Sequence, residues 1–537
     1  YKRQAPGHGV EDYDVCHNHY PEIPIVVPVD SHGKMTEEAG QFAGLTTEEA
    51  NKAIAQHLED TGALFALQKI IHQYPHCWRC KKPVLFRATE QWFCSVDAIK
   101  DQAIEAIKGV KWIPGWGEDR ISSMVRDRND WCISRQRTWG VPIPAFYCKK
   151  CGAYHITDAT IKAVSELFRK EGSDAWYKYE AEQIIPAGEV CEKCGASEWT
   201  KDTDIMDVWF DSGSTHFAAM KKDQGFWPAT MYLEGLDQYR GWFQSSLLTS
   251  IAWRGKAPYK AVVTHGWVVD GQGRKMSKSL GNGVDPLDVI SVYGADALRF
   301  TLVTGNSPGN DLRFSEEKVS ASRNFANKIW NAARFILMNI EGKDIDCALP
   351  KKLYTSDKWI LNRFNNVTAA VTENLEKFEL GMAVSKLYDF IWDDFCDWYI
   401  ELAKIRMNGA DEESADSARR VLVWTMSNTL KLLHPFMPYI TEEIWQTLPH
   451  DGEALIVAKW PEYDEALSFP QEAKNLENVM ALIRAIRTRR NEMNVPPSKK
   501  AHIYIDTAHP APYEEASEFI ARLAYGSKVE IGTGFDI

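Results

Sequence analysis

The 537-residue sequence has no long hydrophobic run and no excess of positive charge. No apolar stretch approaches the roughly 18 residues that cross a bilayer, and the polar start YKRQAPGHG lacks the pattern of a secretory signal. The net charge of −12 argues against an indiscriminate nucleic-acid binder, although it leaves room for local basic patches. These absences predict a protein that does not associate with a membrane.

Disulfide pairing is a second feature that the sequence does not favour. The eleven cysteines are an odd number, and several fall in C-x-x-C pairs, which indicates a reducing compartment and metal binding. With 45% hydrophobic and 25% charged residues the composition is that of a globular protein, and the length predicts roughly three or four domains. We therefore expect a cytoplasmic enzyme.

Residues 271–282 read GQGRKMSKSLGN and place two lysines, Lys275 and Lys278, on a glycine-rich loop. The β-branched run at 261–264 predicts a buried strand just upstream, so the lysines lie beyond a strand end, where open α/β sheets bind ligands. Two ammonium groups there suit a polyphosphate whose charge grows as a bond breaks. For a bare K-x-x-K loop, a solvated basic turn is an equally good interpretation.

The pattern C-x-x-C-G occurs twice, and its cysteines are Cys148, Cys151, Cys191 and Cys194. Each pair can place two thiolates on one tight turn, and two such knuckles complete a tetrahedral site of four thiolates. The pattern favours Zn²⁺ over free thiols, although the insert between the pairs is longer than in compact zinc ribbons. For a third pair, Cys77 and Cys80, metal binding stays open.

Three further patterns concern structure as much as chemistry. Residues 207–213, DVWFDSG, predict a strand that runs into a turn. Arg135 and Arg137 can bind phosphate or form structural ion pairs, and the four arginines at 484–490 can follow a phosphate backbone or form a solvated helix face. Apolar residues at helical spacing predict the core of a helix bundle, and they are Phe325, Ile329, Ala332, Ile336, Leu387, Ile391, Trp398, Leu402 and Ile405.

The pentapeptide KMSKS at 275–279 resembles the second ATP signature of the class I aminoacyl-tRNA synthetases. WCISRQR, DVWFDSG and LEGLDQYRGWF resemble isoleucyl-tRNA synthetases over about residues 1–300, whereas LYDFIWDDFCDWYIELAK and HPFMPYITEEIW resemble valyl-tRNA synthetases over about 300–537. The resemblance implies an α/β plus all-α protein. Its first part would be the C-terminal half of a Rossmann-type catalytic domain with a zinc-knuckle insertion, and a helical-bundle anticodon-binding domain would follow.

The resemblance also implies domain ranges. Residues 1–75 would be the end of an editing insertion, and residues 76–300 a partial Rossmann catalytic domain with its knuckle insertion at about 145–200. A helical anticodon-binding domain would occupy 301–450, and a C-terminal mixed segment 451–537. The partner signature H-I-G-H occurs nowhere in the sequence. We therefore expect a chain that is truncated before this motif and that alone shows little amino-acid-dependent ATP–pyrophosphate exchange.

The activity that the resemblance implies is an ATP-dependent aminoacyl-tRNA ligase that charges tRNA with isoleucine through an aminoacyl-adenylate. Valine is the alternative amino acid, and a non-catalytic tRNA-binding fragment is the alternative of another class. ATP, Mg²⁺ and Zn²⁺ are the implied cofactors. The implied partners are tRNA and isoleucine or valine, with the protein acting as a monomer.

The resemblance further implies site residues, among which Lys275 and Lys278 would be catalytic because they stabilise phosphate charge. The residues implied to bind ATP and the adenylate are Glu234, Gly235, Asp237, Gln238, His265, Lys275, Met276, Ser277 and Lys278. The residues implied to form the amino-acid pocket are Trp209, Gln238 and Trp242. Asp12 would grip the amino group of a mischarged ester during editing; its alternative is an acid that satisfies the first amides of a helix.

Overall fold

The computed structural model of the chain describes residues 6–77, 80–220, 224–277 and 280–535. The chain divides into two compact units: Tyr1–Ser95 with Asn129–Val208 form the first, and Val96–Arg128 with Trp209–Ile537 form the second. None of the described helices is both long and apolar enough to cross a bilayer. The domain ranges expected from the sequence stay predictions, since this division cuts across them.

The first unit is built of short strands and helices. Its elements are α1 (Val10–His19), η1 (Glu37–Phe42), α2 (Thr47–Asp60), β1 (Phe93–Cys94), β3 (Trp131–Cys132), β4 (Ser134–Arg135), β5 (Phe146–Cys148), β6 (Tyr154–His155), α5 (Asp158–Glu171), α6 (Ala175–Lys178), α7 (Ala181–Ile184), β7 (Trp199–Lys201) and β8 (Ile205–Met206). Antiparallel pairing gives a three-stranded sheet in the order β6-β5-β7. Phe146, Trp176 and Trp199 are buried beside this sheet together with two of the knuckle cysteines, and they form a small core of their own.

The second unit begins with a parallel sheet and its covering helices. Its first elements are α3 (Asp97–Lys108), β2 (Lys111–Ile113), α4 (Gly117–Arg126), α9 (Thr215–Ala218), β9 (Tyr232–Gly235), η3 (Leu236–Arg240), α10 (Trp242–Arg254), β10 (Ala261–His265), β11 (Val268–Val269), α11 (Pro286–Tyr293), α12 (Ala295–Val303) and β12 (Leu312–Arg313). The strand order is β2-β10-β9, with all strands parallel. The strand predicted at 261–264 is confirmed as β10, in which Val262 and Val263 are buried.

The strand predicted at 207–213 is wrong, because most of this segment is the helix α8 (Val208–Gly213). The helical turn continues past its end, where the Ser214 amide donates to the carbonyls of Phe210 and Asp211. A short apolar and aromatic run such as Val-Trp-Phe suits a strand or a packed helix equally well, so periodicity alone cannot separate the two. Tertiary contacts choose the helix here, since Trp209 lies against the backbone of Gly241.

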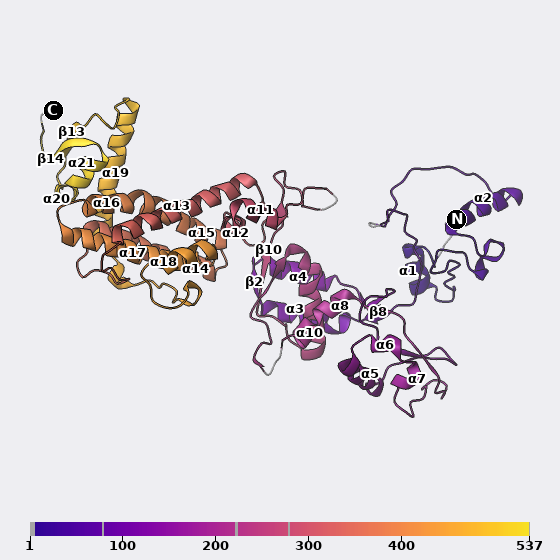
Figure 1. The fold of residues 1–537 in the computed structure, drawn as a ribbon. Coiled ribbons are helices and arrows are strands. Elements are labelled where there is room, and N and C mark those ends of the chain that lie inside the picture. The colour runs from indigo at the N-terminus through magenta and orange to yellow at the C-terminus, as the bar shows by residue number, and fades with distance from the viewer. Residues whose placement is uncertain (1–5, 78–79, 221–223, 278–279, 536–537) are drawn as a thin grey trace. The chain divides into compact units, whose positions relative to one another are not determined.

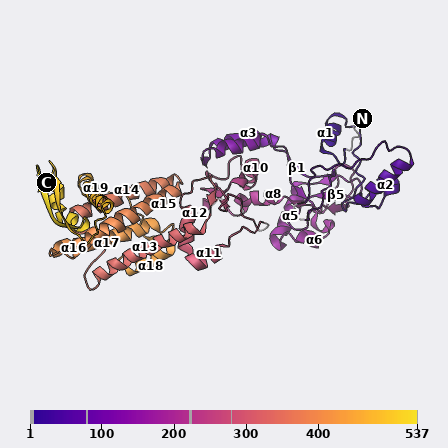
Figure 2. The ribbon, with the colours of Figure 1, turned by 90° about the horizontal axis from the view of Figure 1, so that it is seen from above.

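The rest of the second unit is helical and ends in a small α/β module. Its elements are α13 (Glu316–Ile340), α14 (Thr355–Glu376), α15 (Leu380–Asp389), the π-helix η4 (Phe390–Tyr399), α16 (Ile400–Met407), α17 (Glu412–Leu433), α18 (Pro438–Thr447), η5 (Leu455–Val457), η6 (Glu465–Leu467), α19 (Pro470–Glu492), β13 (Ala501–Asp506), α20 (Ala511–Glu515), α21 (Ser517–Leu523) and β14 (Gly526–Gly532). Figures 1 and 2 both show α13, α14, α15 and α17 side by side.

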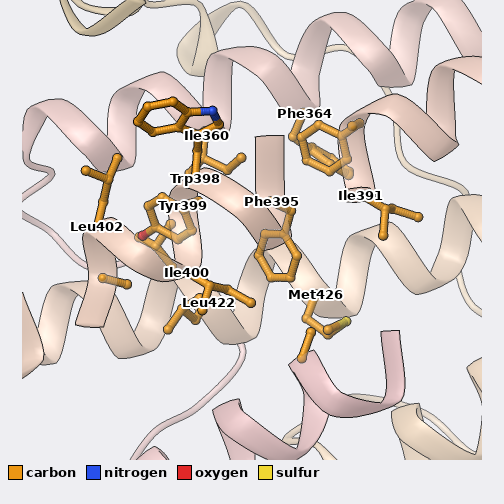
Figure 3. Packing of buried hydrophobic residues seen from close by; sticks show 14 of the residues in the cluster. Ile360, Phe364, Ile391, Phe395, Trp398, Tyr399, Ile400, Leu402, Leu422 and Met426 are labelled. Atoms are coloured by element: carbon orange, nitrogen blue, oxygen red, sulfur yellow. The ribbon is translucent and has the colours of Figure 1, made fainter. Parts of the chain in front are cut away.

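The predicted apolar stripes form the bundle core. Phe325, Ile329, Ala332 and Ile336 are all buried along α13, which confirms the helical interpretation. In the second stripe the chain winds as a π-helix over Phe390–Tyr399 between α15 and α16. Figure 3 shows side chains that this segment contributes to the core, together with side chains of α14, α16 and α17. The labelled ones are Ile360, Phe364, Ile391, Phe395, Trp398, Tyr399, Ile400, Leu402, Leu422 and Met426.

Candidate nucleotide site and metal centre

The candidate nucleotide site lies at the carboxyl edge of the parallel sheet. In the register of β9 and β10, Thr264 pairs with Glu234 and His265 pairs with Gly235, so the two strands end side by side. Buried β-branched residues of β10 hold this edge in place. The Glu234 and His265 side chains are half exposed, with Oε2 and Nε2 3.9 Å apart. Three predicted residues, Glu234, Gly235 and His265, therefore meet at the edge where such sheets bind ligands.

Asp237 and Gln238 follow β9 in the short helix η3 and lead into α10. The Gln238 side chain caps α10, because its Oε1 accepts a hydrogen bond of 2.9 Å from the Trp242 amide. Its Nε2 donates to Asp237 Oδ2 at 3.1 Å. Gly241, between Gln238 and Trp242 in the sequence, has no room for a side chain, since a Cβ would stand 2.5 Å from Gln238 Oε1 and 2.8 Å from the Trp209 ring. Gln238 thus has a structural task besides any contact with a ligand.

The three predicted pocket residues gather at the start of α10. Trp209 is 40% exposed and lies against Gly241 beside Gln238. Trp242 instead packs inward: its ring stacks on Tyr232 with centroids 3.9 Å apart, and its Nε1 donates to the Ser212 carbonyl at 3.0 Å. An exposed indole can contact a ligand directly, whereas a stacked and hydrogen-bonded one supports the wall behind it. Their assignment to an amino-acid pocket stays a prediction.

The lysine loop follows β10 and β11. Lys275 Nζ stands 3.7 Å from the centroid of the Trp267 ring, and Met276 packs against the buried cluster of α11, α12 and α13 that contains Val289 and Val319. The Ser277 amide donates to Asn282 Oδ1 at 3.0 Å. Lys278, the second predicted catalytic lysine, lies outside the described residues. Sequence reasoning missed Trp267, Asp270 and Asn282, although the latter two stand at the two ends of the loop sequence.

The four knuckle cysteines come together in the first unit. The Sγ atoms of Cys148 and Cys194 are 3.5 Å apart, those of Cys151 and Cys191 are 3.6 Å apart, and all four lie within 4.8 Å of one another. Tetrahedral Zn²⁺ with Zn–S bonds of about 2.3 Å needs sulfurs about 3.8 Å apart, so the geometry fits zinc. The glycines after each pair, Gly152 and Gly195, have φ of 71° and donate to the carbonyl of the first cysteine of their knuckle.

The electrostatics of the cluster also suit a cation. Burial raises the pKa of the Cys148 thiol, but hydrogen bonds from the backbone amides of Cys151 and Lys150 outweigh burial and bring the pKa down to about 7. The Ala196 amide lowers the pKa of Cys194, yet burial and the three neighbouring sulfurs outweigh it and raise the value to about 12. Sulfurs this crowded ionise together only beside a positive ion, because their charges repel one another. Donor set and geometry therefore agree on a metal centre.

Cys77 and Cys80 occupy the same kind of turn. The Lys81 amide donates to the Cys77 carbonyl at 2.8 Å, and the Cys77 amide donates to the Lys82 carbonyl at 2.8 Å. Both knuckles have this hydrogen-bond pattern, and Lys81 takes the left-handed φ of 61° that glycine takes in them. The backbone of the third pair is thus shaped for two thiolates, and metal binding there stays a prediction.

For the two groups of arginines that the sequence left between phosphate binding and a structural role, some members have structural partners. Arg135 pairs with Asp207 at 3.1 Å, and Asp207 also accepts from the Trp131 indole, so Arg135 is a structural ion-pair residue. On α19, Arg484 lies over the Trp398 ring and Arg487 donates to the Leu523 carbonyl. These contacts tie α19 to the bundle and to the C-terminal module, which leaves less of the guanidinium groups for nucleic acid.

Asp12 lies in the first turn of α1, where a carboxylate is favoured by the helix dipole. A Cβ on Gly9, the residue that precedes the helix, would stand 3.0 Å from Asp12 Oδ2, so the carboxylate folds back over the helix start. This position agrees with the structural alternative, and the editing role of Asp12 stays a prediction.

Comparison with known families identifies two regions of the chain. Residues 11–315 match the tRNA synthetases class I (I, L, M and V), and residues 357–505 match the anticodon-binding domain of tRNA ligase. The isoleucine–tRNA ligase of Caldicellulosiruptor saccharolyticus is 42% identical over 99% of this chain and 59% of its own length. That of Moorella thermoacetica is 46% identical over 94% of this chain and 55% of its own length.

The chain thus spans little more than half the length of these curated relatives. The first match runs through both halves of the chain, including the region that resembles valyl enzymes, so the valine alternative is not favoured. Among solved structures, Mycobacterium tuberculosis methionyl-tRNA synthetase in complex with methionyl-adenylate aligns with a TM-score of 0.52 at 17% identity, over 73% of each chain. This likeness confirms the predicted fold class, a Rossmann-type α/β part followed by a helical part.

Proposed function

The chain belongs to the class I tRNA synthetases, and from that membership we propose that it acts in the ATP-dependent ligation of isoleucine to tRNA. Similarity to isoleucine–tRNA ligases over 99% of the chain supports isoleucine as the amino acid. The match at 357–505 supports tRNA as the partner. The proposal includes a monomer in the cytoplasm, where the cysteine usage fits a reducing environment.

The reaction has two steps. A carboxylate oxygen of isoleucine attacks the α-phosphorus of ATP, the bond to the β-phosphate oxygen breaks, and pyrophosphate leaves. A hydroxyl of the 3′-terminal ribose of tRNA then attacks the acyl carbon of the adenylate, and AMP leaves. Charge builds on the phosphate oxygens in the first step, so cationic groups that contact them lower the barrier.

One observation carries the proposal: β9 and β10 end side by side, with the lysine loop beginning just beyond β10. Glu234 and His265 at this edge would orient the amino acid and the adenylate through hydrogen bonds, with Asp237 and Gln238 beside them. Lys275 would stabilise the developing phosphate charge, and Lys278, the second lysine of the KMSKS sequence, would do the same. Mg²⁺ would share that task by binding phosphate oxygens, while Zn²⁺ at the four cysteines would hold the first unit together.

Amino-acid-dependent ATP–pyrophosphate exchange tests this proposal. The assay uses residues 1–537 together with the part of the C. saccharolyticus ligase that the match leaves out, supplied as a separate chain. We expect exchange with isoleucine, a much weaker response to valine, and at least a 100-fold loss in K275A, since one such cation contributes about 10²–10³ in rate. Exposed Lys170 on α5 offers the matched control K170A.

The chain without the second component gives the baseline, for which the absence of H-I-G-H predicts little exchange. Exchange that prefers valine would contradict the assignment of the amino acid. If the combined chains bind tRNA but give no exchange with either amino acid, the non-catalytic alternative replaces the proposal.

A further inference from the structure

Asp270, the residue after β11, collects hydrogen bonds from both ends of the lysine loop. Its Oδ1 accepts from the amides of Gln272 at 3.0 Å and Arg274 at 2.8 Å. Its Oδ2 accepts from Arg274 Nε at 2.8 Å and from Asn282 Nδ2 at 3.0 Å. The side chain is only 14% exposed, and these donors, the Asn282 amide first among them, hold its pKa below the ordinary value. The carboxylate therefore stays charged throughout the physiological pH range.

Asn282 completes the connection across the loop. While its Nδ2 faces Asp270, its Oδ1 accepts from the Ser277 amide at 3.0 Å. The two partners fix the orientation of the amide, since a carboxylate only accepts and a backbone N–H only donates. Asp270 and Asn282 are twelve residues apart, so this Asp270–Asn282 clasp closes the base of the loop that carries KMSKS.

Lys275 lies inside the closed loop and has a defined place. A β-bridge joins it to Val269, and its carbonyl lies 3.4 Å from Asn282 Nδ2. Its ammonium group stands over the Trp267 ring, and the Trp267 amide is in turn anchored on Asp311 Oδ1 at 2.7 Å. The attraction between a cation and an indole face is weak enough for a polyphosphate to compete with it. The contact positions the ammonium group and still allows it to move to a phosphate.

We propose that Asp270 and Asn282 are positioning residues for Lys275, and that Trp267 holds its ammonium group over the ring until the phosphates of ATP draw it away. The inference rests on the proposed function for its ligand, but the clasp itself does not. A flexible lysine must lose rotamer freedom to meet a phosphate, and a closed loop base removes part of that cost before the nucleotide arrives. The same clasp limits where Lys275 can move when it leaves Trp267.

Two variants separate the parts of this device. N282A removes both arms of the clasp, and W267L removes the ring while leaving Asp270 and Asn282 in place. Hydrogen exchange of the peptide that contains Ser277, and the acylation rate of Lys275 by an amine-reactive ester, are measured by mass spectrometry on the full chain. The matched control is N324A, which changes an exposed asparagine of α13 that makes no side-chain hydrogen bond within the described part of the chain.

We expect N282A to speed both the hydrogen exchange of the loop and the acylation of Lys275 about tenfold, since both hydrogen bonds of the Asn282 side chain are lost. W267L should speed acylation but leave the loop amides protected, and N324A should match the wild type. If Lys275 in N282A is acylated at the wild-type rate, the clasp does not position it and the inference is wrong.

The ATP–pyrophosphate exchange assay then separates this inference from the proposed function. N282A should lower kcat for exchange by about 10- to 100-fold, with a smaller change in KM for ATP, because a misplaced charge is felt mainly in the transition state. An unchanged kcat in N282A would overturn the positioning role. If the wild type shows no exchange while the labelling pattern holds, the proposed function falls and the clasp stands as a structural feature.

Discussion

At the residue scale, His216 is a buried titratable group that the proposed chemistry does not use. It lies on α9 with no exposed surface, and its Nε2 is 3.0 Å from Thr249 Oγ1. When the Thr249 hydroxyl donates to a main-chain carbonyl, such as that of Gly213 at 2.9 Å, His216 Nε2 is the donor to Thr249 Oγ1. Burial first and the Arg254 guanidinium second lower the pKa of His216 from 6.5 to about 4. The imidazole is therefore neutral in the folded protein at neutral pH.

This shift predicts a pH-dependent loss of stability. Because the unfolded chain binds a proton near pH 6.5 and the folded chain only near 4, stability should fall as the pH drops through this window. The full shift corresponds to about 3 kcal/mol. Urea unfolding between pH 7 and 4 should show that H216Q, which keeps a donor for Thr249, loses less stability than the wild type. H509Q, at an exposed histidine, should follow the wild type, and equal slopes in all three proteins would refute the assignment.

The knuckle cysteines give the second prediction at this scale. Metal analysis should find about one zinc ion per chain at the four-cysteine cluster, and C148S or C191S should abolish it, because three thiolates bind structural zinc much less tightly than four. C347S serves as the control, since Cys347 belongs to the second unit and is not among the four cluster cysteines. Zinc that stays bound in both knuckle variants would show that the sulfurs meet without holding a metal. Zinc above one ion per chain would point to Cys77 and Cys80.

At the scale of elements, a buried ion pair and its hydrogen-bond partners join α14, α16, α17 and the π-helix η4. Asp357 of α14 has no exposed surface and pairs with Arg406 of α16, which is 8% exposed. Asp357 also accepts hydrogen bonds from Tyr399 at 2.7 Å and from Ser417 of α17 at 2.8 Å. Tyr399 is the last residue of the π-helix η4, so the buried carboxylate also contacts the segment that leads into α16.

Removing one member of the pair should cost more than removing both. R406M leaves a buried carboxylate without its cation and should lower the unfolding free energy by about 3–5 kcal/mol, whereas D357N/R406M should recover part of that loss. Urea unfolding of the full chain measures both. The exposed pair of Lys377 and Glu373 supplies the control K377M, which should cost far less stability because water screens the pair. If R406M costs no more than K377M, the pair does not hold the helices together.

At the scale of the whole molecule, short segments and the alignment of the whole chain point to different families for the second half. Individual segments after about residue 300 resemble valyl enzymes, yet the isoleucine–tRNA ligase match runs across 99% of the chain. Segments of the bundle core, such as the one around Trp398 and Tyr399, are constrained by packing. Packing limits the choice of residues there, whichever amino acid a synthetase attaches to tRNA. The match along the whole chain, and not any single segment, therefore supports isoleucine as the proposed amino acid.

The sequence alone predicts the strand β10, the helical bundle and the four-cysteine cluster. Each follows from a local rule: β-branched residues at 261–264, apolar spacing along α13, and the paired C-x-x-C-G knuckles. It also marked Glu234, His265 and Lys275 through segments whose order resembles a known family. Patterns of this kind predict structure correctly because they depend only on residues that are close in the sequence.

The contacts of those residues depend on the packing of elements that are distant in the sequence. The helix at Val208–Gly213, the capping of α10 by Gln238, the stacking of Trp242 on Tyr232 and the hold of Trp267 on Lys275 all depend on partners from other elements. A local pattern cannot show whether a tryptophan lines a pocket or packs behind it, because burial is set by segments distant in the sequence. The Asp270–Asn282 clasp is such a case, since a twelve-residue separation becomes one hydrogen bond only when the loop closes.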